Sequence, residues 1–498
     1  MKVLLISAEL APYAKAGGLA DVAGSLPKAL KALGVDVRVM IPAYPMVLEM
    51  LGSDTVRSQA SIPSASTGQS PARILSSVIP ASPGHDDAIP LYLVEDATGA
   101  KGRKPWFSSA TDSAHIYALE PEPYAFFCRA ALAWLTEYSP GWTPDIVHCN
   151  DWHTGLIPLL LQQRSTEVPT WCKPASLFTI HNLAYQGDFP ADKFACTGLS
   201  QDYYGIDGVE FYGRWTFMKA ALNFSDHVNT VSPGYCKEIL TPEYGCGLDG
   251  LLRKLMSEGK LSGILNGIDT DIFNPEMDKL LVAPYSARLP GGKLVCREAL
   301  QRELCLQISS DRPIIGMVTR FAEQKGFDLV EAEAERILEM PVQLALLGQG
   351  ETRYEQFLLS LQARYPSRVS VTIGYDAALA QRIYAGADLF LMPSRFEPCG
   401  LGQMIAMRYG TLPIVRATGG LADTVVDFSY SDGTGCGFVF DEYSGEALTH
   451  CIERAVEQMQ SPANRTTLSC RAMEQDFSWK RSARDYIALY TYLESVRQ

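Results

Sequence analysis

The sequence predicts an α/β protein with two doubly wound, mostly parallel sheets, in two domains that face each other across a cleft. Two observations lead to this fold class. Short apolar runs alternate with amphipathic helical stretches in both halves of the chain, which is the pattern of βαβ units. The 498 residues are 47% hydrophobic and 20% charged, which is typical of a globular protein, and the length allows two large domains.

The first half of the chain carries the strands and helices of one domain. Its strands are expected at residues 3–8, 35–41, 73–79, 90–94, 145–148, 175–180 and 228–231, and its helices at residues 19–33, 122–137 and 214–223. Residues 57–88 are rich in Ser, Ala, Pro and Gly, so we expect a surface excursion there that contains one strand. An apolar run at residues 261–265 is expected to open the second domain, which limits the first to residues 1–260.

A glycine-containing loop precedes the first predicted helix. Gly17 and Gly18 allow the backbone to approach a ligand closely, the helix start offers free amides, and Lys15 adds a positive charge. A phosphate site and a plain glycine turn with a surface lysine both fit this loop. Its spacing matches neither the dinucleotide-binding G-x-G-x-x-G pattern nor a Walker A loop.

Polar side chains follow two further strands of the first half. Asp151 comes shortly after the strand at residues 145–148, and His181 and Asn182 come directly after the strand at residues 175–180. Parallel strands end at one edge of a sheet, and α/β proteins bind their ligands at that edge. A lone histidine is usually structural, but two polar groups at successive strand ends favour a functional site.

The second half repeats the same alternation. Its strands are expected at residues 314–318, 342–347, 368–373, 388–393 and 412–415, and its helices at residues 293–306, 327–340, 377–385 and 400–409. These elements form a second domain over residues 261–477. A last amphipathic helix is expected at residues 478–498.

The stretch from residue 388 to residue 409 combines a strand, a polar loop and a helix. The loop carries Glu397, and the helix is expected to begin at Gly400 and Leu401, whose amides would be free donors at the positive end of the helix dipole. A carboxylate beside such a helix start fits a ligand that has both hydroxyls and phosphate, such as a nucleotide sugar. Taken alone, the stretch fits an ordinary βα turn equally well.

Two cations occur together in the loop after the strand at residues 314–318. The chain has a net charge of −13 and no long basic run, which argues against nucleic acid and anionic membranes as partners. Arg320 and Lys325 therefore stand out, because a guanidinium binds phosphate through two hydrogen bonds and an ammonium acts as a point charge. A diphosphate is the expected ligand, and an exposed salt-bridged loop is the alternative.

No metal or cofactor site is evident in the sequence. None of the 12 cysteines has C-x-x-C spacing, so we expect reduced thiols, and Cys399 is either structural or reactive. Asp269 and Asp271 resemble an acidic metal-binding pair, but they follow an Asn-Gly turn signal and are expected to form a turn. No signal peptide or transmembrane segment is visible, so a cytoplasmic protein is expected.

Five motifs together resemble those of the bacterial glycogen synthases and plastid starch synthases. They are Lys15-x-Gly17-Gly18-Leu19, Asp151-Trp152-His153, His181-Asn182-Leu183-Ala184-Tyr185-Gln186-Gly187, Arg320-x-x-x-x-Lys325-Gly326 and Pro393-Ser394-Arg395-Phe396-Glu397-Pro398-Cys399-Gly400-Leu401. The likeness runs in order along nearly the whole chain. It implies the GT-B fold, with the acceptor on the first Rossmann-like domain, the nucleotide-sugar donor mainly on the second, and a C-terminal helix that returns to the first.

The resemblance also implies an activity and a set of site residues. The activity is transfer of glucose from a nucleotide donor, usually ADP-glucose, to the non-reducing 4-hydroxyl of an α-1,4-glucan, with retention of configuration and without a metal or cofactor. His181 is expected beside the anomeric centre, Arg320 and Lys325 at the leaving diphosphate, and Glu397 at the sugar hydroxyls. The other residues expected to bind donor or substrate are Lys15, Gly17, Gly18, Asp21, Asp151, Asn182, Tyr375, which would stack on adenine, Cys399, Gly400 and Leu401.

One departure from the wider retaining GT-B pattern affects ribose binding. That group often has a second glutamate eight residues after the first, and this chain has Ile405 there. Other functions also stay open at this point. They are a transferase that uses UDP-glucose or another acceptor, a pyridoxal-phosphate phosphorylase with an absorbing Schiff base, and a catalytically silent glucan-binding protein. The plastid stroma is the alternative to the cytoplasm.

Overall fold

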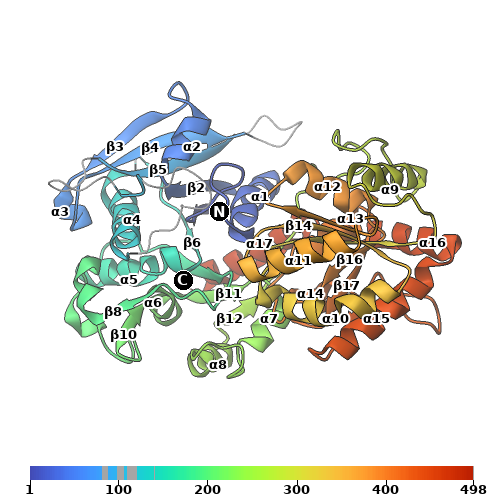
Figure 1. Cartoon of the computed structure of the whole chain (residues 1–498). Helices are drawn as coiled ribbons and strands as arrows, with labels where there is room; N and C mark the ends of the chain where they lie inside the picture. Colours follow the sequence, from blue (N-terminus) through green and yellow to red (C-terminus); the bar gives the residue numbers. More distant parts are fainter. Residues whose placement is uncertain (81–87, 98–105, 109–119, 140, 497–498) are drawn as a thin grey trace. The chain divides into compact units, whose positions relative to one another are not determined.

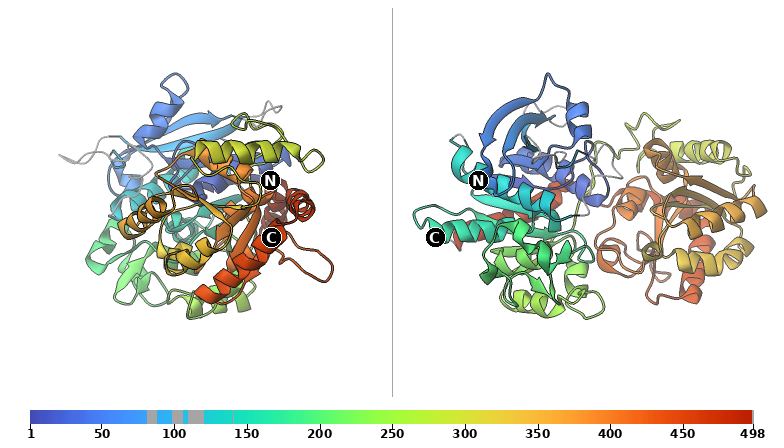
Figure 2. Two further views of the ribbon diagram at one scale, coloured as in Figure 1. Left: turned by 45° about the vertical axis from the view of Figure 1, so that its right-hand side comes forward. Right: turned by 60° about the vertical axis from the view of Figure 1, so that its left-hand side comes forward.

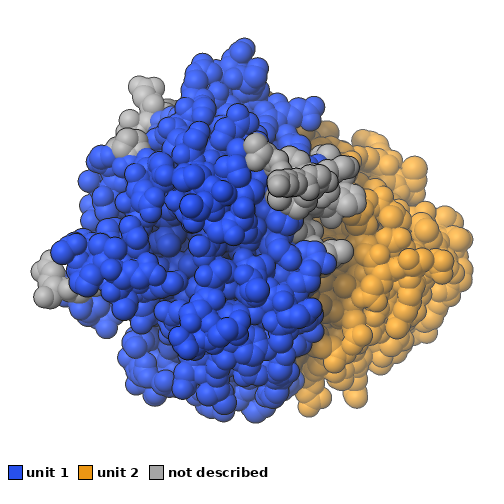
Figure 3. Space-filling model, turned by 90° about the vertical axis from the view of Figure 1, so that its left-hand side faces the viewer, with its two compact units in different colours: residues 1–231, 236–267, 479–498 blue, residues 232–235, 268–478 orange. Residues whose placement is uncertain are grey.

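The chain folds around two large β-sheets, each covered by its own helices (Figure 1). The structure is a computed structural model that describes residues 1–80, 88–97, 106–108, 120–139 and 141–496. It divides into two units, shown in different colours in Figure 3. Unit 1 contains residues 1–231, 236–267 and 479–498, and unit 2 contains residues 232–235 and 268–478.

Unit 1 is built on a nine-stranded sheet that is parallel over most of its width. In order across the sheet, its strands are β12 (Leu261–Gly263), β11 (His227–Thr230), β7 (Ala175–Ile180), β6 (Ile146–Asn150), β1 (Lys2–Ile6), β2 (Asp36–Pro42), β5 (Ile89–Asp96), β4 (Ala72–Ile79) and β3 (Arg57–Ile62). Only the β5–β4 and β4–β3 pairs are antiparallel. The strand order reverses beside β1, which has β2 on one side and β6 on the other.

Helices and a small second sheet complete unit 1. The helices are α1 (Gly18–Ala32), α2 (Pro45–Leu51), α3 (Ser64–Thr67), α4 (Glu122–Ala133), α5 (Ile157–Glu167), α6 (Phe217–Phe224), α8 (Asp249–Ser257) and α17 (Trp479–Ser495), and α7 (Pro233–Glu238) begins in unit 2. The small antiparallel sheet has the order β8 (Asp188–Pro190), β10 (Arg214–Thr216) and β9 (Glu210–Phe211). In the described part of the chain, no helix is long and apolar enough to cross a bilayer.

The last helix of the chain packs on the sheet of unit 1, as the resemblance predicts. Helix α17 lies at the red end of the chain among the blue and green elements of this unit (Figure 2). The Tyr490 hydroxyl hydrogen-bonds to His148 Nδ1 on β6 at 2.8 Å, and the Tyr486 hydroxyl accepts from Asn229 Nδ2 on β11 at 3.1 Å. Burial lowers the pKa of His148 to about 3, so its ring is neutral where it meets the helix.

Unit 2 is built on a six-stranded, wholly parallel sheet. Its strands, in order across the sheet, are β15 (Val369–Ile373), β14 (Gln343–Gly348), β13 (Ile314–Val318), β16 (Leu389–Met392), β17 (Leu412–Arg416) and β18 (Phe438–Phe440). Its helices are α9 (Gly291–Glu303), α10 (Phe327–Glu339), α11 (Thr352–Arg364), α12 (Ala377–Gly386), α13 (Gly402–Arg408), α14 (Gly419–Thr424), α15 (Gly445–Met459) and α16 (Pro462–Met473). The order reverses between β13 and β16.

Both faces of the unit 2 sheet are buried, which explains why its strands are apolar at successive positions. Ile315 and Met317 of β13 belong to a core cluster with residues of α10 and α15. Ile314 of the same strand belongs to a second cluster, on the opposite face, with residues of α9 and α12. Alternate side chains of a strand point to opposite faces, so a strand covered on both sides reads as a continuous apolar run.

Three expectations from the sequence are corrected by the structure. The strand expected to open the second domain is β12, which pairs with β11 in the sheet of unit 1, so this part of unit 1 extends to Gly267. The helix expected at residues 214–223 begins at Phe217, because the three residues before it form β10. The helix expected from Gly400 begins at Gly402, because Gly400 has a φ of 73°, which a right-handed helix does not accept.

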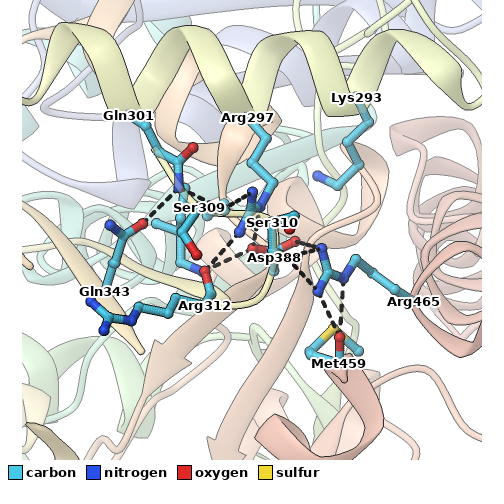
Figure 4. Close-up of polar contacts among 12 residues, drawn as sticks. Lys293, Arg297, Gln301, Ser309, Ser310, Arg312, Gln343, Asp388, Met459 and Arg465 are labelled. Atoms are coloured by element: carbon cyan, nitrogen blue, oxygen red, sulfur yellow. Dashed lines mark hydrogen bonds and ion pairs between the residues drawn. The ribbon is translucent and has the colours of Figure 1, made fainter. Parts of the chain in front are cut away.

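A buried ion pair joins α9 to the start of β16 (Figure 4). Arg297 Nε and the Ile314 amide both donate to Asp388 Oδ2, each at 2.8 Å. Arg465 lies 3.8 Å from the other carboxylate oxygen. The Arg297 side chain is 8% exposed and that of Asp388 is 3% exposed, so each charge depends on the other for compensation.

Lys293 projects from the same face of α9 as Arg297 (Figure 4). Its contacts link two other helices. Its ammonium donates to the Ala385 carbonyl in the last turn of α12 at 3.0 Å and to the Tyr409 carbonyl just after α13 at 2.9 Å. It also donates to Thr411 Oγ1 at 2.8 Å. Burial lowers the pKa of Lys293 to about 7, although the charge of Asp388 acts in the opposite direction.

This burial predicts a pH-dependent stability. Lysine has a pKa of 10.5 in the unfolded chain and about 7 here, so between these values the unfolded state binds the additional proton and stability rises with pH. Against Lys293→Met, the free energy of unfolding of the wild type is expected to gain about 1 kcal/mol per pH unit over that range. Urea unfolding at several pH values measures this difference. The exposed Lys279→Met variant serves as control, and pH profiles of wild type and Lys293→Met that run parallel would contradict the prediction.

Candidate active site

Unit 1 gathers polar residues at the carboxyl ends of three adjacent strands, β1, β6 and β7. This edge includes the point where the strand order reverses, and open α/β sheets leave a crevice at such a point. The polar residues there are called the unit 1 cluster and are Glu9, Lys15, Asp21, Asn150, Asp151 and His181. Four of them were expected from the sequence, and Glu9 and Asn150 were not.

Glu9 organises the loop that the sequence offered as a phosphate site. Its carboxylate Oε2 accepts the amides of Ala16 at 2.8 Å and of Gly17 at 2.9 Å, and the side chain is 1% exposed. These two amides are therefore already occupied. The expected positive charge is also paired, because Lys15 Nζ lies 2.7 Å from Asp21 Oδ1. The loop thus presents an ion pair and the open backbone of Gly17, around which an added Cβ would meet no atom within 4 Å.

Asp151 lies in an unusual backbone conformation at the end of β6. Its φ is 62°, its amide donates to the Thr179 carbonyl at 2.9 Å, and its carboxylate accepts the Trp152 amide at 3.0 Å. Burial raises the pKa of Asp151 to about 8. The Trp152 hydrogen bond lowers this pKa and the charge of Glu9 raises it. A positive φ and a raised pKa at the same residue are typical of a functional position.

His181 is held by Asn150, which fixes its tautomer. Asn150 Nδ2 donates to the carbonyls of Ile6 at 3.3 Å and His148 at 3.2 Å, so its Oδ1 is the atom that faces His181 Nε2 at 3.1 Å. Nε2 therefore carries the proton. Burial lowers the pKa of His181 to about 3, so the ring is neutral near pH 7. The Asn182 side chain accepts the Ala184 amide at 3.1 Å in a local turn.

Unit 2 brings together two of the residues expected to be catalytic. Lys325 Nζ lies 2.6 Å from Glu397 Oε2, and Ser394 Oγ donates to the same oxygen at 3.1 Å. Lys325 is in the loop after β13 and Glu397 is in the loop after β16, so the pair sits where the strand order reverses. The Lys325 side chain is 17% exposed and that of Glu397 is 8% exposed. A third expected residue, Arg320, is exposed, and no acid among the described residues pairs with it.

The two loops meet because a glycine removes the side chain between them. Gly326 has a φ of 79°, and a Cβ there would lie 2.2 Å from the Pro393 carbonyl oxygen. The Arg395 amide also donates to the Gln324 carbonyl at 2.9 Å. The side chain of Arg395 pairs with Glu323 and Asp328, at 2.9 and 3.1 Å. This arginine therefore holds the loops together and is not a free cation for a ligand.

The turn after Glu397 presents backbone donors, as the sequence predicts. In the described part of the chain, the amides of Gly400 and Leu401 have no hydrogen-bond acceptor. Cys399 is 5% exposed. Tyr375 follows the edge strand β15 and is 78% exposed, so a face of its ring is open for stacking.

The described residues contain no group of three or more His, Cys, Asp or Glu side chains arranged to hold a metal ion. The Asp269 carboxylate accepts the amides of Asp271 and Ile272, at 3.0 and 3.2 Å. This is the turn that the sequence predicts for these residues, formed by a side chain that hydrogen-bonds its own backbone.

Comparison with known proteins matches the whole chain. Residues 2–254 match the family described as the starch synthase catalytic domain, and residues 305–467 match the glycosyl transferases group 1. The glycogen synthase of Geotalea daltonii is 43% identical over 497 residues, with 98% of each chain covered. The glycogen synthase 2 of Geobacter sulfurreducens is 42% identical over 499 residues, with 100% of each chain covered.

Solved structures give the same result for the fold. The catalytic domain of starch synthase IV from Arabidopsis thaliana, bound to ADP and acarbose, matches with a TM-score of 0.85 and 33% identity over 99% of each chain. This match confirms the predicted GT-B fold class. Sucrose-phosphate synthase from Thermosynechococcus elongatus has a TM-score of 0.59 and 20% identity over 99% of each chain, which shows a shared fold alone.

The Lys325–Glu397 pair predicts a strong energetic coupling. Removing one partner leaves a buried charge without compensation, whereas removing both does not. In a double-mutant cycle with Lys325→Met and Glu397→Gln, the coupling free energy is expected to be about 2 kcal/mol. Urea unfolding of the four proteins measures it. The exposed pair Arg302–Glu298 provides a matched control with a coupling below about 0.5 kcal/mol. Equal couplings for the two pairs would show that Lys325 and Glu397 are not a buried pair.

Proposed function

The chain belongs to the glycogen and starch synthase family, and from this premise we propose that it transfers glucose from ADP-glucose to the non-reducing 4-hydroxyl of an α-1,4-glucan with retention of configuration. It is a glycosyltransferase of glycogen or starch synthesis. The main support for this donor and reaction is a set of three residues that follow the adjacent strands β13 and β16 of unit 2. They are Arg320, Lys325 and Glu397. Two cations suit a leaving diphosphate, and a carboxylate suits sugar hydroxyls. The starch synthase IV structure contains ADP, which supports an adenine donor.

The proposed chemistry places cations where negative charge develops. As the bond between C1 and the diphosphate oxygen breaks, its electron pair stays on the diphosphate. Arg320 and Lys325 stabilise that charge, and the amides of Gly400 and Leu401 add two neutral donors. Charges and dipoles that are already in place need no reorganisation during the reaction, which makes this kind of stabilisation effective. Tyr375 stacks on the adenine in this proposal.

Retention follows in the proposal from attack on the face that the diphosphate leaves. The acceptor oxygen forms its bond to C1 on that face, and its proton passes to an oxygen of the departing diphosphate. A double displacement would instead need a carboxylate nucleophile and an acid about 5 Å apart. Glu397 is engaged by Lys325 and Ser394, and Glu9 by two backbone amides, so neither fits the role of a free nucleophile.

The unit 1 cluster supplies the contacts to the glucosyl group in this proposal. The Nε2 proton of the neutral His181 is held by Asn150, so its Nδ1 can accept one hydrogen bond from a sugar hydroxyl, and the ring adds no positive charge beside an oxocarbenium-like centre. Asp151 binds a sugar hydroxyl, and Lys15 with Gly17 and Gly18 borders the glucosyl group. A cytoplasmic location, expected from the sequence, stays a prediction.

Glucan elongation with a glycogen primer tests the donor. At equal concentrations, ADP-glucose is expected to give strong incorporation and UDP-glucose weak incorporation, and an α-1,4-specific hydrolase should release the added glucose. A preference for UDP-glucose would contradict the proposed donor but would leave the proposed transfer reaction unchanged. No incorporation from either by a folded protein would indicate another acceptor or a silent glucan binder, and release of glucose phosphate from glycogen by inorganic phosphate would indicate a phosphorylase.

Removing Lys325, the cation proposed to stabilise the leaving diphosphate, tests the mechanism. Lys325→Ala is expected to lower kcat by about 100-fold or more, the scale of removing one preorganised donor to a developing charge. Steady-state kinetics with ADP-glucose and glycogen measure the effect. Lys279→Ala removes an exposed lysine of the same unit and is expected to keep near-normal activity. A near-normal kcat for Lys325→Ala would remove Lys325 from the proposed mechanism.

A further inference from the structure

Gln403 is a fully buried side chain beside the turn that carries the free amides, and neither the sequence nor the proposed chemistry gives it a role. It is 0% exposed and lies near the start of α13. Its Nε2 lies within hydrogen-bond distance of the Cys399 carbonyl at 3.1 Å, the Gly400 carbonyl at 2.9 Å and Thr424 Oγ1 at 3.1 Å. The Thr424 hydroxyl in turn donates to the Gly420 carbonyl at 2.6 Å, so it can accept from Gln403.

The two carbonyls that Gln403 contacts belong to the same peptide groups as the two free amides. A peptide group is planar and trans, so its carbonyl and its N–H point in opposite directions. The Cys399 carbonyl shares a peptide with the Gly400 amide, and the Gly400 carbonyl shares one with the Leu401 amide. By holding both carbonyls, Gln403 fixes both peptide planes. It therefore directs both N–H groups away from itself.

The surrounding backbone leaves this turn little freedom to adopt another shape. A Cβ on Gly400 would lie 2.6 Å from Gln403 Oε1, and a Cβ on Gly420 would lie 2.2 Å from the Cys399 carbonyl oxygen. The Gly420 amide donates to the Glu397 carbonyl at 3.1 Å, which connects the same turn to the Glu397 loop. The Gln403 side chain and the Gly420 backbone therefore both lie close against this turn.

The Gln403 carboxamide oxygen has no partner in the described part of the chain, which indicates that the turn requires the NH₂ group of this side chain. Gln403 Oε1 is buried and has no hydrogen-bond partner among the described residues. A buried polar atom without a partner is costly and calls for a reason. The reason here is the NH₂ group, since only a donor serves two carbonyl oxygens. A glutamate has the same shape but would face those carbonyls with an ionised oxygen.

We propose that Gln403 is a positioning residue for the donor's diphosphate. It orients the Gly400 and Leu401 amides, which bind the diphosphate, and does not itself contact the substrate. This inference rests on the proposed function, because it takes the diphosphate as the ligand of those amides. Its specific consequence is that changing Gln403 weakens recognition of the phosphates and leaves recognition of the nucleoside unaltered.

Inhibition by ADP and by adenosine separates these two parts of the donor. With ADP-glucose as the varied substrate, Gln403→Glu is expected to raise the inhibition constant of ADP and the KM of ADP-glucose by about tenfold or more. The inhibition constant of adenosine is expected to rise by less than about twofold. Gln343→Glu is the matched control. Gln343 is also buried in unit 2 and donates from Nε2 to a carbonyl, that of Gln307, at 2.7 Å. It is expected to lose stability without the ADP-specific effect.

Lowering the pH gives a second readout on the folded variant. The introduced carboxyl group regains one donor when it is protonated, so the ratio of ADP to adenosine inhibition constants in Gln403→Glu is expected to recover in part from pH 8 to pH 6, relative to wild type. If Gln403→Glu does not fold, Gln403→Asn keeps the NH₂ group on a shorter side chain and is expected to show a smaller ADP-specific loss. Wild-type inhibition constants for ADP in the folded variants would overturn the role of Gln403 and leave the proposed function intact. Failure of ADP to inhibit the wild type would overturn the proposed donor and this inference with it.

Discussion

Parallel strand pairing is the constraint on which both the unit 1 cluster and the Lys325–Glu397 pair depend. In unit 2 the register pairs Ile315 with Leu389 and Gly316 with Phe390, so β13 and β16 run side by side and end at one edge of the sheet. The loops that follow them then have to occupy the same region. Lys325 and Glu397 are 72 residues apart in the chain and meet at 2.6 Å for this reason. In unit 1 the same rule brings the ends of β1, β6 and β7 together.

The position of the Glu397 loop is set from both ends of β16. Before the strand, Asp388 is held by Arg297 and by the Ile314 amide, so the start of β16 is fixed to α9 and to β13. After the strand, Glu397 is held by Lys325 and Ser394. A buried pair of this kind contributes little net stability, but losing one partner is costly, so each pair penalises displacement of the strand. Lys293 also links the carboxyl ends of α12 and α13 through hydrogen bonds. Tyr375 lies just before the start of α12, and Leu401 lies just before the start of α13.

The sequence predicts those parts of the fold that depend on local pattern. The apolar runs of β7 and β13 have the predicted bounds, and the polar residues after β6, β7, β13 and β16 lie where parallel pairing places them. The sheet to which β12 belongs is not encoded locally, because a three-residue strand fits either domain. Glu9 lies just after the first predicted strand, and only the folded loop shows that its carboxylate accepts two amides. The start of α13 depends on the φ of Gly400, which the helical pattern alone does not reveal.

In the Lys325–Glu397 pair, two charges of the candidate site compensate each other within unit 2. A carboxylate and an ammonium that are this well buried would each be costly alone, and at 2.6 Å each compensates the other. In the proposed reaction Lys325 binds a phosphate oxygen of the donor and Glu397 binds a sugar hydroxyl. Each side chain therefore replaces its partner in the ion pair with a polar group of the donor, and neither is left without a partner. Arg320 differs, because it is exposed and has no acid partner in the described part of the chain. In the proposal its full charge is therefore available to the diphosphate. One cation is thus compensated by a carboxylate and the other is exposed, so the proposed site avoids an uncompensated buried charge and still attracts an anion.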